Sequence, residues 1–94
     1  MITRLVGDIE VPALGLGTWP MKGTECSAAV HAALSVGYRH IDTAARYGNE
    51  EAVGEGIKAS GIGRSSVFLT TKVWYDQLGK EDLLSSARDS LKRL

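Results

Sequence analysis

The sequence lacks the features that mark several specialised classes of protein. Cys26 is its one cysteine, which excludes a disulfide framework and a thiolate metal cluster and leaves a lone thiol best interpreted as a small core residue. No apolar run approaches the length of a membrane span. The N-terminal MITRLVGDIEVP also lacks the charged start, apolar core and cleavage site of a secretory signal. We therefore expect a cytoplasmic protein.

An excess of charge of one sign is missing too. There are 11 Lys and Arg residues and 11 Asp and Glu residues, so the overall charge attracts neither nucleic acid nor an anionic membrane. We expect neither as a partner. A hydrophobic content of 44% is typical of a globular chain, and 94 residues suffice for one modest core.

What is present is an alternation of short apolar strands with amphipathic helices. Residues 1–12 hold two β-branched runs around a Gly-Asp turn, which predicts a β-hairpin. This alternation continues to the last residue and is typical of parallel α/β folds. The predicted strand–loop–helix units span residues 13–37, 38–61 and 67–94.

Single residues predict where these elements begin and end. Thr24 and Asn49 are suited to cap the first two helices, and Gly37 and Gly61 to end them. The strand predicted at residues 67–73 is apolar enough to be covered on both faces. The third helix carries an apolar stripe of Leu83, Ala87, Leu91 and Leu94.

A doubly wound nucleotide-binding sheet shares this alternation but needs a glycine fingerprint after its first strand. Gly15 and Gly17 stand there, yet Pro20 replaces the third glycine and no helix begins at that turn. We therefore interpret the two glycines as a place where backbone packs closely near the strand end.

Two charged residues fall in unusually apolar strands. When the second and third strands are aligned by their starts, in matching register, Asp42 and Lys72 come to the same C-terminal end, where α/β proteins place their active sites. Each charge is costly to bury alone and is the natural partner of the other. They form either a structural ion pair or a catalytic one, and these two residues alone do not decide which.

Tyr47 favours the catalytic interpretation. It lies five residues past Asp42, in a loop at the same end of the sheet. A free phenol has a pKa of about 10, and a neighbouring ammonium lowers that pKa because it favours the ionised form. An Asp-Lys-Tyr cluster can therefore make a tyrosine act as a general acid. The alternative is an ordinary loop tyrosine with a solvated hydroxyl.

The remaining aromatic and imidazole groups are weaker candidates. Trp19 and Trp74 follow the first and third strands, so they either line an apolar pocket or cover the barrel end. His40 is expected to be a hydrogen-bonded interior residue, and His31 to lie on a helix away from the strand ends. No grouping of side chains has metal-ligand spacing, so we predict no metal site.

The stretch GYRHIDTAARYGNEEAVG, residues 37–54, resembles the first signature of the aldo-keto reductases, and PALGLGTWPM, VFLTTKVW and SARDSLKRL resemble flanking parts of that family. The resemblance covers essentially the whole chain. It implies a (β/α)8 barrel of the TIM type whose bottom is closed by an N-terminal hairpin. It also implies metal-free reduction of small aldehydes and ketones with a hydride from NADPH.

The resemblance also implies roles for individual residues. Tyr47 matches the general acid, Lys72 the residue that makes the phenol more acidic, and Asp42 the salt-bridge partner of the lysine. The positions near the nicotinamide ribose are matched by Gly17, Thr18 and Asp42, and those lining the substrate pocket by Trp19, Tyr47 and Trp74.

A complete barrel needs roughly 250 residues, so three strand–helix units represent only part of one. A fourth strand with the family's catalytic histidine, and the later cofactor-binding loops, would lie beyond Leu94. We therefore expect the isolated chain to be catalytically inactive. The rival hypothesis is a non-enzymatic module that associates with itself or a partner through its exposed sheet edges.

Overall fold

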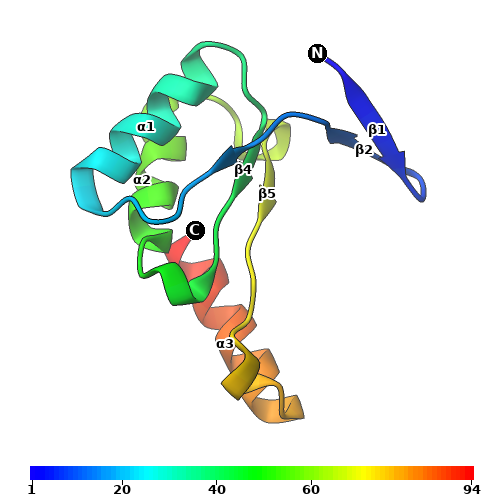
Figure 1. Cartoon of the computed structure of the whole chain (residues 1–94), viewed down its shortest axis with the longest axis vertical. Helices are drawn as coiled ribbons and strands as arrows, with labels where there is room; N and C mark the ends of the chain where they lie inside the picture. The colour runs from blue at the N-terminus through cyan, green and yellow to red at the C-terminus, as the bar shows by residue number, and fades with distance from the viewer.

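The computed structural model describes residues 1–94 and shows a hairpin followed by a three-stranded parallel sheet with helices packed on it (Figure 1). Short 3-10 turns, Ala45–Tyr47, Arg64–Ser66 and Tyr75–Gln77, fill three of the loops. The elements are β1 (Thr3–Val6), β2 (Ile9–Pro12), β3 (Leu16–Gly17), α1 (Gly23–Ser35), β4 (His40–Asp42), α2 (Glu50–Ser60), β5 (Phe68–Thr70) and α3 (Lys80–Arg93).

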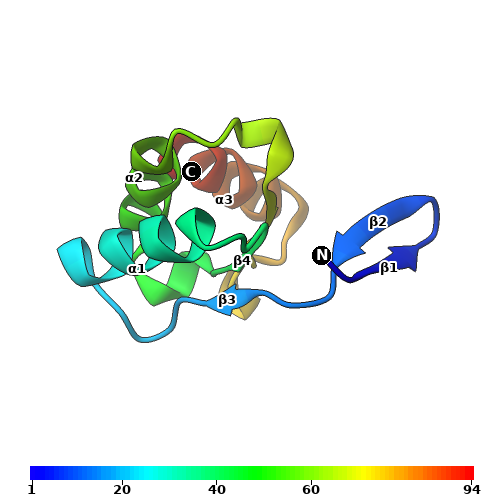
Figure 2. The same cartoon turned by 90° about the horizontal axis from the view of Figure 1, so that it is seen from above.

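β1 and β2 form an antiparallel hairpin that stands apart from the rest of the chain (Figure 2). Gly7 opens its two-residue turn with a φ of +61°, a conformation that favours glycine. Most of the hairpin is exposed, and Pro12 is its one buried residue.

The parallel sheet has the order β3-β4-β5, so β4 is central and the other two strands each have an unpaired edge. The strands are shorter than predicted, because a residue counts as part of a strand only where it pairs with the neighbouring strand. The prediction that residues 67–73 are covered on both faces is wrong: all three residues of β5 are partly exposed. Leu69 packs against the hydrophobic core, and Phe68, on the opposite face of β5, lies with its ring centroid 4.9 Å from that of His40.

The core lies between the sheet and the α1–α2 pair, which lie side by side in Figure 1. Cys26 is fully buried there, as predicted. Gly56 lets the two helices approach closely, because a Cβ at this position would stand 2.6 Å from the Ser27 carbonyl oxygen and 2.7 Å from the Val30 Cβ. The fully buried hydrophobic centre consists of Cys26, Val30, Leu34, Ile41 and Val53.

The predicted helix boundaries agree in part with the structure. Gly61 ends α2 at a φ of +73°, as predicted, and Gly37 follows the end of α1 at a φ of +111°. The prediction that Thr24 caps α1 is wrong: the helix begins one residue earlier, after Lys22, and no side chain caps it. Asn49 occupies the predicted N-cap position of α2, but its side chain bonds elsewhere.

α3 is only partly docked. Its first half runs beyond the C-terminal ends of the strands (Figure 1), and Ser90 is its one buried residue. The predicted apolar stripe is largely uncovered, since Leu83 is 39% and Leu91 76% exposed. Its C-terminal end is docked, since Leu94 packs against the hydrophobic core.

Candidate active site

The candidate site lies at the C-terminal ends of β3, β4 and β5. The observed register pairs Gly17 with Asp42 and Asp42 with Thr70. Lys72 therefore lies two residues beyond the partner of Asp42, and the expectation that the two charges stand in matching register is wrong. The long lysine side chain reaches back over this offset.

Asp42 and Lys72 nevertheless form the predicted ion pair. The Lys72 Nζ donates hydrogen bonds to the Asp42 Oδ1 at 2.7 Å and to the Thr43 carbonyl oxygen at 3.1 Å. The two side chains are 49% and 42% exposed, so this pair is not buried as the apolar strands suggested. An exposed pair contributes only about 0–1 kcal/mol of stability, so its main consequence is the position of the ammonium.

The ionisation of Lys72 follows from its surroundings. Partial burial lowers the pKa of Lys72, but the hydrogen bond that Lys72 donates to Asp42, the negative charge of Asp42 and the neighbouring Tyr47 phenol outweigh that effect and hold the pKa above its ordinary value of 10.5. Lys72 is therefore a cation throughout the neutral range.

Tyr47 lies beside this pair. It ends the 3-10 turn Ala45–Tyr47 and is half-buried, with its ring centroid 5.3 Å from the Lys72 Nζ. The turn is held by the Ala45 amide, which donates to the Lys72 carbonyl oxygen at 3.1 Å, and by Lys22, whose Nζ donates to the Tyr47 carbonyl oxygen. The structure thus brings together the three residues of the predicted cluster.

Of the residues predicted near a nicotinamide ribose, two face outward and one does not. Gly17 is exposed beside Asp42, and a Cβ added to it would meet nothing within 4 Å, so a ligand has room there. Thr18 is fully buried, which excludes a side-chain contact with a bound ligand in this structure. Gly17 and Asp42 therefore leave room for a cofactor, whereas the Thr18 side chain can only support the site from within the core. Gly15, not Gly17, makes the predicted close packing, since its Cβ would stand 3.1 Å from the His40 ring.

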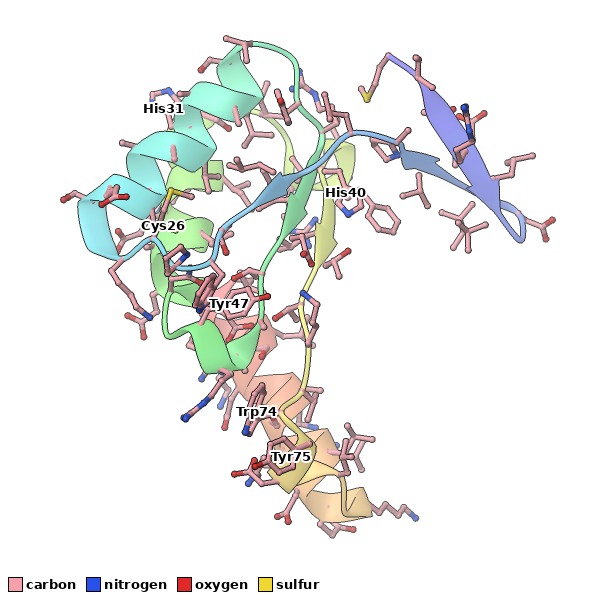
Figure 3. All side chains as sticks on the ribbon, in the orientation of Figure 1. Cys26, His31, His40, Tyr47, Trp74 and Tyr75 are labelled. Carbon is pink, nitrogen blue, oxygen red and sulfur yellow. The ribbon has the colours of Figure 1, made fainter.

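The two tryptophans do not form a pocket in this chain. Trp19 is 68% exposed, and Trp74, at 39%, packs against Tyr75 with tilted rings whose centroids are 5.0 Å apart and lies under the Arg46 guanidinium at 5.4 Å. Figure 3 shows Tyr47, Trp74 and Tyr75 following one another along the same end of the molecule. None of the four main cavities is lined by Trp19, Tyr47 or Trp74.

His40 is hydrogen-bonded, as predicted, but it is only partly buried. The His40 ring bonds the Pro12 carbonyl oxygen at 3.0 Å and the Thr70 hydroxyl at 3.2 Å, so it links the hairpin to β5. His31 is exposed on α1. No helix of the structure has the length and apolar character needed to cross a membrane.

The sequence model of the aldo/keto reductase family matches residues 13–94, which include every strand and helix of the parallel layer. The chain belongs to the aldo/keto reductase family. Among characterised relatives, it is 46% identical over 86 residues to a methylglyoxal reductase of Salmonella typhi, covering 92% of this chain and 32% of the relative. It is 47% identical over 92 residues to a glyoxal reductase of Bacillus subtilis, covering 97% of this chain and 33% of the relative.

Solved structures give the same assignment. An aldo/keto reductase from Brucella melitensis superposes with a TM-score of 0.93 at 47% identity, over 98% of this chain and 36% of the other. A Bombyx mori aldo-keto reductase in complex with NADP superposes with a TM-score of 0.88 at 35% identity, over 99% and 34%. These neighbours are (β/α)8 barrels, and this aldo/keto reductase chain spans about a third of their length.

Sequence analysis missed a buried polar network behind the site of this aldo/keto reductase chain. The Asn49 amide donates to the Thr18 carbonyl oxygen at 3.2 Å and to the Met21 carbonyl oxygen at 3.0 Å. It also accepts at 2.8 Å from the Thr43 hydroxyl, which is itself bonded to that of Thr18 at 3.0 Å. The network joins the ends of β3 and β4 to the start of α2 and so fixes both sides of the Tyr47 turn.

Proposed function

We propose that this chain supplies the acid half of the active site of an NADPH-dependent reductase of aldehydes and ketones. The carrying observation is the contact of the Lys72 ammonium with Asp42 at 2.7 Å, beside the Tyr47 ring. In this proposal Tyr47 protonates the carbonyl oxygen of the substrate, and Lys72 stabilises the phenolate that remains. Asp42 holds the ammonium in place. NADPH, when bound, supplies the hydride that adds to the carbonyl carbon.

Other residues of the chain are proposed to contact the cofactor and the substrate. Gly17 leaves open space beside Asp42 for the ribose side of the cofactor, and Thr18 supports that loop from the core. Trp19 and Trp74 offer apolar surface for a small carbonyl compound. The relatives named as methylglyoxal and glyoxal reductases favour a small, reactive aldehyde as the substrate class.

We further propose that the 94-residue chain alone is inactive, because neither Tyr47 nor the two tryptophans line any of its four main cavities, so the site lacks an enclosed pocket. The chain is mixed with NADPH and methylglyoxal, and the nicotinamide absorbance is followed. We expect no decrease beyond that of a protein-free control. Clear turnover would contradict the proposal.

A chimaera tests the role of Tyr47. Residues 1–94 replace the matching segment of the Bacillus subtilis glyoxal reductase, to which they are 47% identical. We expect NADPH-dependent glyoxal reduction, with kcat lowered about 100-fold or more by Tyr47→Phe, the typical loss on removing a general acid. Tyr38→Phe, outside the site, is the matched control. Equal activity of the two variants would reject the acid role.

The rival function is a non-enzymatic module that associates through its edges. The uncovered stripe on α3 and the unpaired edges of β3 and β5 favour it. An active chimaera combined with a monomeric 94-residue chain speaks against this rival. An inactive chimaera combined with a stable oligomer speaks for it.

A further inference from the structure

Glu50 is a buried carboxylate in the first turn of α2. The residue is 2% exposed, and every hydrogen bond to its carboxylate comes from a residue distant in sequence. Thr71 Oγ1 donates to Glu50 Oε2 at 2.6 Å, and Ser90 Oγ and Arg93 Nε donate to Oε1 at 3.1 and 2.8 Å. A carboxylate is retained in such a position only when its oxygens are well paired, which these contacts achieve.

The position of Glu50 relates it to the candidate acid. Tyr47 precedes it by three residues, and its partner Thr71 immediately precedes Lys72. Residues 71 and 72 lie beyond the last ladder pair of β5, which is Asp42 with Thr70. Beyond that pair, the Ala45 amide donates to the Lys72 carbonyl oxygen at 3.1 Å and so supports the backbone that carries Lys72 from the β4 side. The Thr71 hydroxyl fixes it from the helix side, while the Lys72 ammonium is held on the opposite side by Asp42.

We propose that Glu50 is a positioning residue for the Tyr47–Lys72–Asp42 cluster, acting through its hydrogen bond with Thr71. The carboxylate fixes the backbone of Lys72 relative to the start of α2 and hence to Tyr47. The catalytic meaning of this role rests on the proposed function, whereas the mechanical link between Glu50 and Lys72 does not.

A purely structural role for Glu50 is the alternative. In that case the carboxylate matters only because Arg93 and Ser90 attach α3 to α2 through it. The chain allows the two roles to be separated. Thr71→Val removes the link toward Lys72 with little change in shape, and Arg93→Met removes the ionic link to α3 and leaves Thr71 in place.

The experiment follows the titration of Lys72 by NMR in the 94-residue chain labelled at the lysine side chains, with Lys72→Met to assign the signal. We expect wild-type Lys72 to titrate above its ordinary value of 10.5. Thr71→Val should move that titration toward the ordinary value, because the ammonium loses its fixed contact with Asp42. Thr71→Ser, which keeps the hydroxyl, should restore it, and Arg93→Met should leave it unchanged while lowering the unfolding midpoint.

Two outcomes would overturn the proposal. One is an unchanged Lys72 titration in Thr71→Val. The other is an equal shift in Arg93→Met, which would mean that general loosening of the fold moves Lys72. Neither outcome bears on the reductase proposal, because the titration requires no activity and the Tyr47→Phe chimaera tests that proposal separately.

Discussion

Two ion pairs of this chain lie in opposite environments. Lys72 and Asp42 are each about half exposed, so water and salt screen them. Glu50 is only 1% exposed in its side chain, and its partner Arg93 is 34% exposed. A solvated pair costs little to form or to lose, whereas a buried carboxylate depends on all its partners. The surface pair is thus suited to function, and the buried pair to holding the fold.

This contrast predicts different losses of stability. Asp42→Asn should lower the free energy of unfolding by less than about 1 kcal/mol. Glu50→Gln should lower it by about 3 kcal/mol, the lower end for breaking a buried pair, because Arg93 can still reach water. Urea unfolding of both variants at neutral pH measures the difference. Losses of equal size would contradict the contrast.

Cys26 gives a prediction on pH. Burial, followed by the charge of Glu25, raises the pKa of the Cys26 thiol above its ordinary value of 9.0, against a smaller opposing effect of Lys22. A raised pKa means that the folded state holds the proton more tightly than the unfolded state. Its contribution to stability is therefore complete below pH 9.0 and is lost as the pH rises through the raised value.

The test compares wild type with Cys26→Ala in urea between pH 7 and pH 11. Within the titration window the wild type should lose up to about 1.4 kcal/mol per pH unit more than the variant, which has no thiol. Every other ionisable group is present in both proteins, so its effect cancels in the difference. Parallel curves for the two proteins would rule out a buried, titrating thiol.

At the residue scale, the sequence predicted the cluster but not its support. Tyr47, Lys72 and Asp42 could be grouped because strand order alone brings them to one end of the sheet. In the sequence, Glu50 is only an acidic residue that follows the predicted N-cap Asn49. Its partners lie 21, 40 and 43 residues away, and no local pattern distinguishes a buried carboxylate from an exposed one.

At the scale of elements, the packing of α1 on α2 depends on the small size of Gly56. This contact puts the Ser27 carbonyl and the Val30 side chain almost against the α2 backbone. The alternation of strands with amphipathic helices predicted both helices. It could not predict how closely they approach, because that distance depends on which small residue of one helix faces the other.

Gly56→Ala should therefore destabilise the chain. Overpacking a close contact costs about 1–3 kcal/mol, which outweighs the gain of roughly 1 kcal/mol in helix propensity. Gly63→Ala is the control, since its Cβ meets nothing within 4 Å and its φ of −57° suits any residue. Thermal unfolding followed by circular dichroism should show a lower midpoint for Gly56→Ala alone. A higher midpoint for Gly56→Ala would show that the helices can separate at little cost.

On the scale of the whole molecule, the three strands correspond to part of a barrel. The chain matches 36% of the Brucella melitensis reductase with a TM-score of 0.93, so its fold is that of the family although its surfaces are not all covered. Periodicity predicted an apolar stripe on α3 correctly as a pattern. What it could not predict is that Leu83 and Leu91 stay exposed, because burial depends on the elements that face the stripe.

These uncovered surfaces predict that the 94-residue chain associates with itself at high concentration. Leu91 is 76% exposed on α3 and is expected to enter the contact. Leu91→Lys should weaken the association about tenfold or more, because burying a leucine contributes about 1.5–3 kcal/mol and each 1.4 kcal/mol is a factor of ten. Val36→Lys, at an equally exposed position at the end of α1, should have a smaller effect. Sedimentation equilibrium over a range of concentrations measures the association of both variants and of the wild type. A wild-type chain that remains a monomer and unfolds cooperatively would show that α3 needs no partner.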